Sequence, residues 1–288
     1  MTSEPQPARA PSRAYARRPA GGMGNLLSRV VVGAAGLPLV LGVVWLGHWW
    51  LFALVLAAGI VALHEFYAMT RPLRPIGIAG HAGLIGILFA VQVSTLTWAI
   101  GALLAVVALA FLLKGLAGTS GSATVSVSTT LLGPAWIGFG LGFVLLLRDI
   151  HGHGRLAAYT LLLAVFANDT FAYLAGRALG RHKLAPALSP GKTLEGFLVG
   201  TAACVFVTFV ALYHDRHTYL SIGQALLLGL VIAAAAPAGD LFESMLKRDM
   251  GVKDTGRILG GHGGMLDRID AILFASVATY YTVLAFTT

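Results

Sequence analysis

Charged residues are scarce in this sequence, and cysteine is almost absent. Asp, Glu, Lys and Arg make up 11% of its 288 residues, against about 25% in soluble proteins. The single cysteine, Cys204, excludes a disulfide within the chain and a metal site built on cysteines. Hydrophobic residues reach 57%, and the mean hydropathy is +0.80. This composition excludes an ordinary soluble domain and predicts a polytopic membrane protein that crosses the bilayer with helices.

The apolar runs set the predicted organisation of the chain. Residues 1–29 are rich in Pro, Ala, Ser and Arg, which predicts a disordered basic tail. We expect an all-α fold with two transmembrane regions, 30–147 and 148–288, and with a polar site in the second. The nine predicted spans are 30–47, 49–68, 76–94, 96–114, 126–147, 157–178, 197–213, 219–238 and 269–287.

The positive charges predict how these spans are oriented. Loops after even-numbered spans contain Arg71, Arg74, Lys114, Arg181, Lys183, Lys192 and the cations of the segment 240–270. Loops after odd-numbered spans contain Arg148, Arg155 and Arg216. By the positive-inside rule, the N-terminus and the segment 240–270 are cytoplasmic. The same bias accounts for much of the net charge of +8, so no nucleic-acid partner is implied. The high Ala, Gly and Arg content favours a bacterial source and hence the inner membrane.

The most polar stretch of the sequence runs from Asp240 to Asp270. Its carboxylates are Asp240, Glu243, Asp249, Asp254, Asp267 and Asp270, and its cations are Lys247, Arg248, Lys253, Arg257 and Arg268. Glycines on both sides of His262 let the backbone approach a ligand closely. Two interpretations remain open. The stretch is either a solvated loop or a site that holds a metal ion and a polyphosphate.

A second polar region lies between residues 168 and 196. Asn168 and Asp169 fall near the centre of the span predicted at 157–178. An aspartate inside a membrane needs water, a cation or a polar partner, which favours a functional site. The following loop contains the run SPGKT at 189–193, which predicts a tight turn. It is not a P-loop, because position 186 holds Pro where that motif needs Gly.

Other polar residues leave alternatives open. Glu65 ends the second predicted span beside His64. An interfacial carboxylate and a functional role are both compatible with this position. His151 and His153 lie two residues apart in a loop on the predicted outer side. Without further ligands, we expect them to be solvated rather than to bind a metal.

The polar residues follow a pattern that resembles a known family. The pattern comprises Ser244, Lys247, Arg248, Lys253, Asp254, His262, Gly263, Gly264, Asp267, Arg268 and Asp270, preceded by Asn168, Asp169, Ser189, Pro190, Lys192, Thr193, Glu195 and Gly196. It is similar to the signature of the phosphatidate cytidylyltransferases, the CDP-diacylglycerol synthases. The resemblance covers residues 165–287, while the first half matches only as apolar helices. The sequence departs from the family at Gly260, where many members have Pro, and at Thr255 and Ala271, where many have Ser.

The resemblance implies a reaction and a set of site residues. CTP and phosphatidic acid would give CDP-diacylglycerol and pyrophosphate, in a membrane-embedded, helical nucleotidyltransferase that is a homodimer. It also implies Mg²⁺ as one or two divalent cations, and a monovalent cation beside them stays open. The implied catalytic residues are Asp267, Asp240 and Lys247, and the substrate-binding residues are Ser189, Lys192, Ser244, Arg248, Lys253, His262 and Arg268. Asp240 and Asp267 are the implied metal ligands. Asp169 is expected to face the same cavity, as a third ligand or as the partner of a cation.

The chemistry of the residues agrees with this reaction. The lipid phosphate is already an anion, so the reaction needs positioning and charge neutralisation more than a strong base. Asp240 and Asp267 are 27 positions apart, and we expect the turn Gly260–Gly264 to let the chain fold back between them. Two alternatives are a CTP-dependent lipid kinase of the polyprenol or phytol type, which would release CDP, and a secondary transporter, for which no internal repeat is visible.

Overall fold

The computed structural model describes residues 36–287 except 37, 94–95, 119–120 and 257–262. The predicted tail 1–29 and His262 therefore lie outside the described residues. Residues 38–46 are helical. The elements that follow are α2 (His48–Met69), η1 (Arg71–Leu73), α3 (Gly77–Val93), α4 (Leu96–Ala117), α5 (Ala123–Gly133), η2 (Pro134–Gly138), α6 (Phe139–Arg148), α7 (Gly154–Leu179), β1 (Lys183–Ala185), β2 (Ser189–Thr193), α8 (Leu194–Leu212), α9 (Ile222–Asp249) and α10 (Leu266–Thr287).

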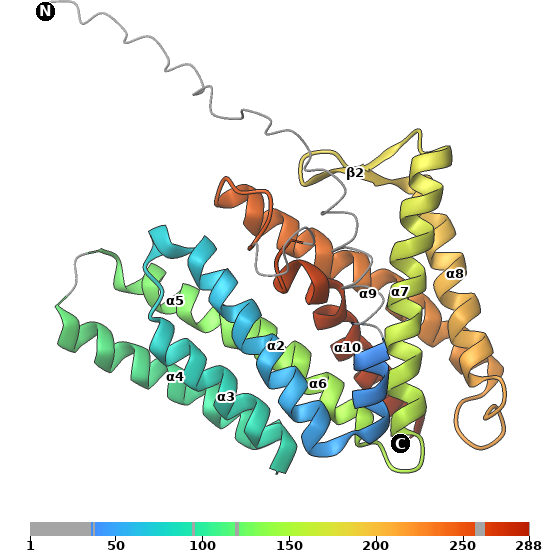
Figure 1. The fold of residues 1–288 in the computed structure, drawn as a ribbon, viewed down its shortest axis with the longest axis horizontal. Coiled ribbons are helices and arrows are strands. Elements are labelled where there is room, and N and C mark those ends of the chain that lie inside the picture. Colours follow the sequence, from blue (N-terminus) through green and yellow to red (C-terminus); the bar gives the residue numbers. More distant parts are fainter. Residues whose placement is uncertain (1–35, 37, 94–95, 119–120, 257–262, 288) are drawn as a thin grey trace, which may run out of the picture.

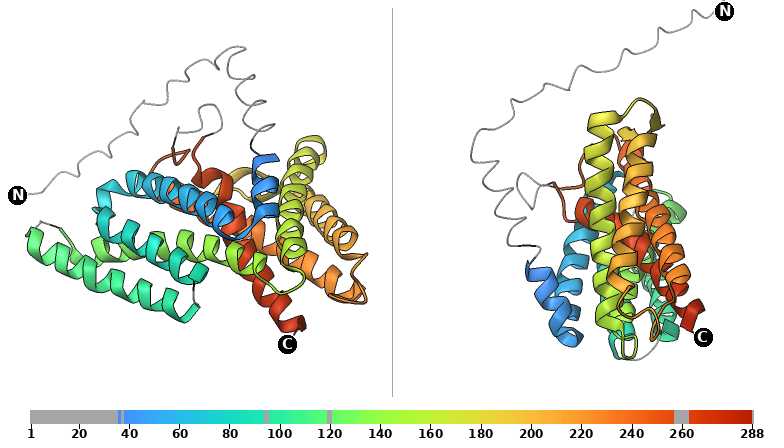
Figure 2. Two further views of the ribbon diagram at one scale, coloured as in Figure 1. Left: turned by 60° about the horizontal axis from the view of Figure 1, so that its bottom comes forward. Right: turned by 90° about the vertical axis from the view of Figure 1, so that its right-hand side faces the viewer.

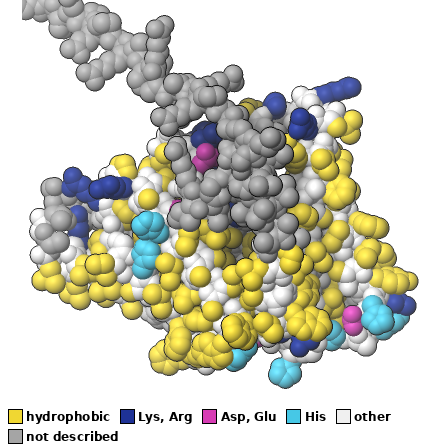
Figure 3. Space-filling model, viewed as in Figure 1, with side chains coloured by type: hydrophobic (Ala, Val, Ile, Leu, Met, Phe, Trp, Pro, Cys, Tyr) yellow, Lys and Arg dark blue, Asp and Glu magenta, His cyan; other side chains and the backbone are white. Residues whose placement is uncertain are grey.

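Within the described part, seven helical segments are long and apolar enough to cross a membrane. They are His48–Met69, Leu96–Leu116, Ala123–Arg148, Gly154–Leu179, Leu194–Leu212, Ile222–Asp249 and Leu266–Thr287. The shorter apolar helix α3 occupies the predicted span 76–94. The span predicted at 30–47 is only partly described. The chain is therefore a polytopic helical protein, and hydrophobic side chains cover most of the face shown in Figure 3.

The helices form two groups that α10 joins. α2 to α6 make up one group and α7 to α9 the other, as Figures 1 and 2 show. α10 packs against α6 on one side and against α9 on the other. One buried core includes Leu63, Phe66 and Leu84, and a second includes Leu161 and Ile232. Because α10 contributes buried residues to both cores, its N-terminal end is fixed relative to both groups.

The predicted span 126–147 is one helical path with an irregular middle. α5, η2 and α6 follow one another without a gap from Ala123 to Arg148. The wider π turn of η2 begins at Pro134, whose ring nitrogen has no hydrogen to donate to the preceding turn. The prediction of a single span here is confirmed.

Helix α9 extends well past the span predicted at 219–238. A capping box between Ser221 and Gln224 begins the helix, which ends only at Asp249. Glu243 and Lys247, four residues apart, form an ion pair across one helical turn. The positive charges of Lys247 and Arg248 in the last turn also stabilise the C-terminal end of the helix dipole. The predicted span therefore covers the apolar part of α9, and the helix continues through Asp240 to Asp249. Hydropathy indicates the part of a helix in lipid rather than the end of the helix.

The loop between α7 and α8 contains the two strands. β1 pairs with β2 in an antiparallel hairpin, with Lys183 opposite Thr193 and Ala185 opposite Ser189. The tight turn predicted at 189–193 is therefore wrong, because these residues form β2. The Thr193 side chain then caps α8 by accepting the Gly196 N–H at 3.1 Å.

The opposite end of the bundle contains the histidines of the predicted outer loops. The rings of His153 and Tyr219 stack with centroids 4.2 Å apart and an interplanar angle of 3°. Burial raises the pKa of Tyr219 to about 12. His151 is exposed, as predicted, whereas His153 is half-buried against Tyr219.

The approach of α9 to α10 depends on Gly239. A Cβ at this position would collide with the backbone carbonyl of Asp270, which cannot move like a side chain. We expect Gly239→Ala to destabilise the protein by about 1–3 kcal/mol, measured by SDS-induced unfolding in mixed micelles. Gly223→Ala is the control, because Gly223 lies in the same helix with no atom within 4 Å of the added carbon. An unchanged stability of Gly239→Ala would contradict the prediction.

Candidate functional site

Polar side chains from four elements meet at one end of the bundle. α9 contributes Asp240, Glu243, Ser244 and Lys247, α10 contributes Asp267 and Asp270, α7 contributes Asp169, and β2 contributes Lys192. In Figure 1 the C-terminal ends of α7 and α9 and the strand β2 lie along the upper side. These residues are called the polar cluster below.

Lys247 is the centre of one half of the polar cluster. Its Nζ lies 2.5 Å from Glu243 Oε2 and 2.8 Å from Asp267 Oδ1. The side chains of Lys247, Glu243 and Asp267 are 13%, 1% and 10% exposed. The helix itself sets the pair with Glu243, one turn away, whereas the pair with Asp267 requires α10 to pack beside α9. Two buried carboxylates therefore share one ammonium group.

Asp267 is held through both of its oxygens. Its Oδ2 accepts hydrogen bonds from Gly264 N at 2.8 Å, Thr255 N at 3.2 Å and Thr255 Oγ1 at 3.0 Å. The residue lies in the first turn of α10, where the helix dipole favours a negative charge. Gly263 has a φ of 80°, which glycine adopts without steric strain. The backbone before α10 therefore orients this carboxylate without a bound ligand.

Lys192 is the centre of the other half. Its Nζ lies 2.8 Å from Asp240 Oδ2, and the two side chains are 24% and 35% exposed. Ser244 Oγ donates to Asp240 Oδ1 at 3.4 Å. Asp169 interacts electrostatically with both Lys192 and Asp240, and Asn168 donates to it at 3.4 Å. Asp169 is exposed in the described structure, unlike the buried Glu243 of the other half.

Asp270 connects the two halves. It is 8% exposed and accepts the Ala271 N–H at 2.8 Å. It also interacts electrostatically with Asp240 and Lys247, and its carboxyl group lies next to that of Glu243. The polar cluster is thus continuous from β2 through α9 to α10.

Contacts with the side chains of Arg248 and Glu195 hold the β-hairpin at this end of the bundle. Arg248 Nε donates to the Leu188 carbonyl at 3.3 Å. Glu195, in the first turn of α8, accepts from Arg181 N at 3.1 Å and lies 2.6 Å from His182 Nδ1. These contacts fix the strand that carries Lys192.

The other predicted residues differ in how far they are buried. Ser189 is half-buried on β2, while Lys253 and Arg268 are exposed, and Arg268 has contacts of its own. The predicted pair Asp240 and Asp267 is brought into one cluster, but each carboxylate contacts a different lysine.

Sequence reasoning left four residues of this region out of the site. They are Glu243, Asp270, Thr255 and Glu65, which all contact or adjoin the predicted residues. For Glu243 the signal was its spacing of four residues before Lys247, and for Asp270 its position one turn after Asp267. Glu65 carried the signal of a carboxylate in an apolar run. For Thr255 the signal was its place in the family pattern, where many members have Ser, another residue with a hydroxyl group.

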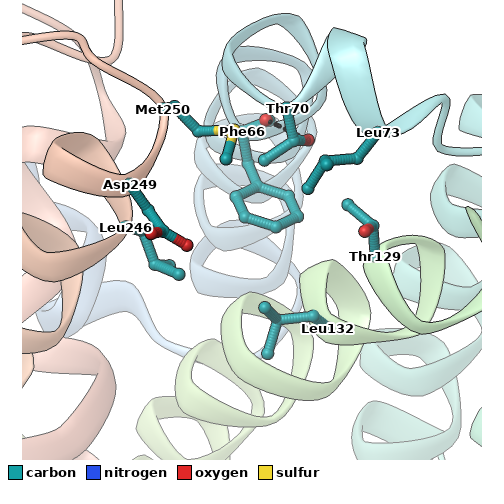
Figure 4. A pocket seen from close by; sticks show the side chains of 8 residues that line it. All are labelled: Phe66, Thr70, Leu73, Thr129, Leu132, Leu246, Asp249 and Met250. Carbon is teal, nitrogen blue, oxygen red and sulfur yellow. Dashed lines mark hydrogen bonds between the residues drawn. The ribbon is translucent and has the colours of Figure 1, made fainter. Parts of the chain in front are cut away.

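An apolar hollow lies on the other side of α9. It has a volume of about 50 Å³ and lies between α2, η1, α5 and α9, with the lining side chains shown in Figure 4. Ligand pockets have volumes of about 300–1,000 Å³. The hollow is therefore too small for a nucleotide, and the polar cluster remains the candidate site.

The donor set is compatible with a divalent cation. Among the described residues, no group of three or more His, Cys, Asp or Glu side chains is arranged to hold a metal ion. Mg²⁺, however, needs only one or two carboxylates when phosphate oxygens and water complete its shell. The carboxylates of the polar cluster outnumber its two lysines, and the buried Glu243 Oε1 has no hydrogen-bond partner among the described atoms. This surplus of carboxylate oxygen fits a metal ion that binds together with phosphate.

Comparison with known proteins points to one family. A model described as "Cytidylyltransferase family" matches residues 27–286. The phosphatidate cytidylyltransferase of Staphylococcus haemolyticus is 42% identical over 144 residues, which are 50% of this chain and 54% of that protein. The enzyme of the same name from Staphylococcus aureus strain COL is 42% identical over 147 residues, with the same coverage.

A third relative has no assigned activity in its name. The uncharacterized protein YnbB of Escherichia coli K12 is 42% identical over 130 residues, which are 45% of this chain and 43% of that protein. The chain thus spans about half the length of the curated relatives it matches. The family model, in contrast, extends over nearly the whole chain and includes every residue of the polar cluster. The chain therefore belongs to the cytidylyltransferase family.

Proposed function

We propose that this chain transfers the cytidylyl group of CTP to phosphatidic acid and forms CDP-diacylglycerol and pyrophosphate. The observation that carries the proposal is the polar cluster itself. Two lysines and several carboxylates, contributed by the residues of the family motif, lie together at the end of a membrane helix bundle. At this end, a lipid headgroup and a water-soluble nucleotide can meet. The names of the Staphylococcus relatives support the same activity.

In the proposed reaction, an oxygen of the lipid phosphate attacks the α-phosphorus of CTP. The bond between that phosphorus and the oxygen that bridges to the β-phosphate breaks, and pyrophosphate leaves. Because the lipid phosphate is already anionic, no residue has to remove a proton from it. The protein instead has to bring two anions together and neutralise the charge on the leaving group.

The residues of the polar cluster suit these tasks. Lys192 and Lys247 are held in place by carboxylates, so their ammonium groups are positioned before the substrates bind. Arg248, Lys253 and Arg268 add cations around them for the phosphates. Ser244 and Ser189 supply hydroxyl groups in the same region. Asp240, Asp267 and Asp169 would hold Mg²⁺, which supplies charge neutralisation on the phosphates when bound.

We further propose that the polar cluster faces the cytoplasm. Arg71 and Arg74 follow α2, and Arg181 and Lys183 follow α7. In Figure 1 the C-terminal ends of these two helices lie on the same upper side as β2. The positive-inside rule therefore supports a cytoplasmic N-terminus. We propose the bacterial inner membrane as the location on the Ala, Gly and Arg content of the sequence. A homodimer is proposed on the family resemblance alone.

The proposal predicts the products formed by the purified chain in mild detergent. With CTP, phosphatidic acid and Mg²⁺, we expect pyrophosphate and CDP-diacylglycerol in equal amounts, and no turnover when either substrate is left out. Product formation is measured by coupled phosphate release and by thin-layer chromatography of labelled lipid. Release of CDP would instead indicate a lipid kinase. An absence of nucleotide turnover in a folded sample would contradict both activities.

A further inference from the structure

Glu65 is a buried carboxylate in a helix that belongs to the other half of the molecule. It lies near the end of α2 and is 2% exposed. Glu65 is therefore shielded from solvent by the protein, although it lies near the end of the helix. A carboxylate in such a position needs hydrogen-bond donors or a cation.

The contacts of Glu65 lead to the backbone that precedes and begins α10. Its Oε2 accepts the Leu266 N–H at 3.0 Å, a contact between residues 201 positions apart. It also accepts from the backbone of Met265. Free N–H groups at the start of a helix are satisfied by such an acceptor, so Glu65 caps α10 from another helix.

Two glycines, Gly256 and Gly264, pack directly against the same carboxylate. A Cβ at Gly256 would collide with Glu65 Oε1, and a Cβ at Gly264 would lie 2.6 Å from Glu65 Oε2. Gly256 follows Thr255, and the N–H of Gly264 donates to Asp267. The Glu65 side chain therefore contacts both backbone segments whose N–H groups hold Asp267 Oδ2.

We propose that Glu65 is a positioning residue that holds the carboxylate of Asp267 in place. It does so through the N-terminus of α10 and through the backbone at 255–256 and 264–266. The role of Asp267 in turnover rests on the proposed function, whereas the bracing of Asp267 does not. Helix α2, which lies outside the family pattern of polar residues at 168–196 and 244–270, thereby contributes a residue to the site.

The test compares Glu65→Ala and Glu65→Gln with Tyr67→Phe in the full chain. Tyr67 lies on the same helix and is also buried, but its hydroxyl donates to the Thr130 carbonyl at 2.6 Å and touches neither segment. Tyr67→Phe thus controls for the loss of a buried hydrogen bond in α2. Glutamine keeps an acceptor for the Leu266 N–H. The amide exchange rate and the kcat of Glu65→Gln are therefore expected to fall between those of Glu65→Ala and those of the unchanged chain.

Two measurements are made on each protein. Hydrogen exchange of the amides at 264–268 reports the bracing directly, and the kcat for CDP-diacylglycerol reports its effect on turnover. We expect Glu65→Ala to exchange faster at 264–268 and to lose about 10–100-fold in kcat, with kcat/KM falling in parallel. Tyr67→Phe is expected to keep the exchange and the kcat of the unchanged chain.

Each outcome decides the proposal. Unchanged exchange at 264–268 in Glu65→Ala overturns it, and so does faster exchange with an unchanged kcat. If Glu65→Ala does not fold, Glu65→Gln decides by the same two criteria. If the unchanged chain makes no CDP-diacylglycerol, the proposed function fails, and exchange at 264–268 alone then supports or overturns the bracing of Asp267.

Discussion

Asp267→Asn is expected to lower the rate of pyrophosphate release by about 10²–10³-fold. Asparagine preserves the shape of the side chain but removes a charge that Lys247 and, in the proposed reaction, Mg²⁺ both require. Charge stabilisation by a bound metal contributes several kcal/mol to a transition state, and each 1.36 kcal/mol corresponds to about tenfold in rate. The rate is measured with both substrates saturating, over a series of Mg²⁺ concentrations.

Asp249→Asn is the matched control for this prediction. Asp249 is an exposed carboxylate at the end of α9 and lines the apolar hollow rather than the polar cluster. The same change of charge there should leave the rate unaltered. A rate for Asp267→Asn close to that of the unchanged chain would remove Asp267 from the proposed site, provided that both variants elute as folded protein on size exclusion.

Lys247→Met is expected to destabilise the protein by about 3–5 kcal/mol and to abolish turnover. The substitution leaves the carboxylates of Glu243 and Asp267, which are 1% and 10% exposed, without their shared cation. Removing one partner of a buried ion pair is costly because the remaining charge stays buried. Stability is measured by circular dichroism during unfolding with SDS in mixed micelles.

A double variant separates the two effects of Lys247. The double variant Glu243→Gln/Lys247→Met removes one of the two carboxylates that Lys247→Met leaves without a cation. It should therefore be more stable than Lys247→Met alone. Turnover should stay lost, because the ammonium group is still absent from the phosphate site. Lys183→Met, at the exposed first residue of β1, is the control for loss of a lysine. Wild-type stability of Lys247→Met would show that the buried pair does not hold α9 to α10.

The apolar helices could be predicted closely from the sequence. The span expected at 49–68 is α2 (His48–Met69), and that expected at 269–287 is α10 (Leu266–Thr287). The prediction works because a backbone in lipid must satisfy its hydrogen bonds internally, which leaves the helix as the spanning element for long apolar runs. The polar segments beyond the apolar runs could not be predicted in this way. Neither the extension of α9 to Asp249 nor the hairpin at 183–193 follows from hydropathy.

The residue types of the candidate site could also be predicted, but not their pairing. The motif pointed to Lys192, Asp240, Lys247 and Asp267 as members of one site. That Lys192 contacts Asp240 while Lys247 contacts Asp267 depends on how β2, α9 and α10 pack.

The sequence by itself determined that this chain is a helical membrane protein, and it predicted which charged residues form the candidate site. Both are local properties, because apolar runs and motif spacings are set by neighbouring residues. Only the tertiary structure decided that Glu65 of α2 contacts the N-terminus of α10, 201 positions away. Such a contact arises from the packing of α10 between two groups of helices, and no local pattern encodes the distance between them.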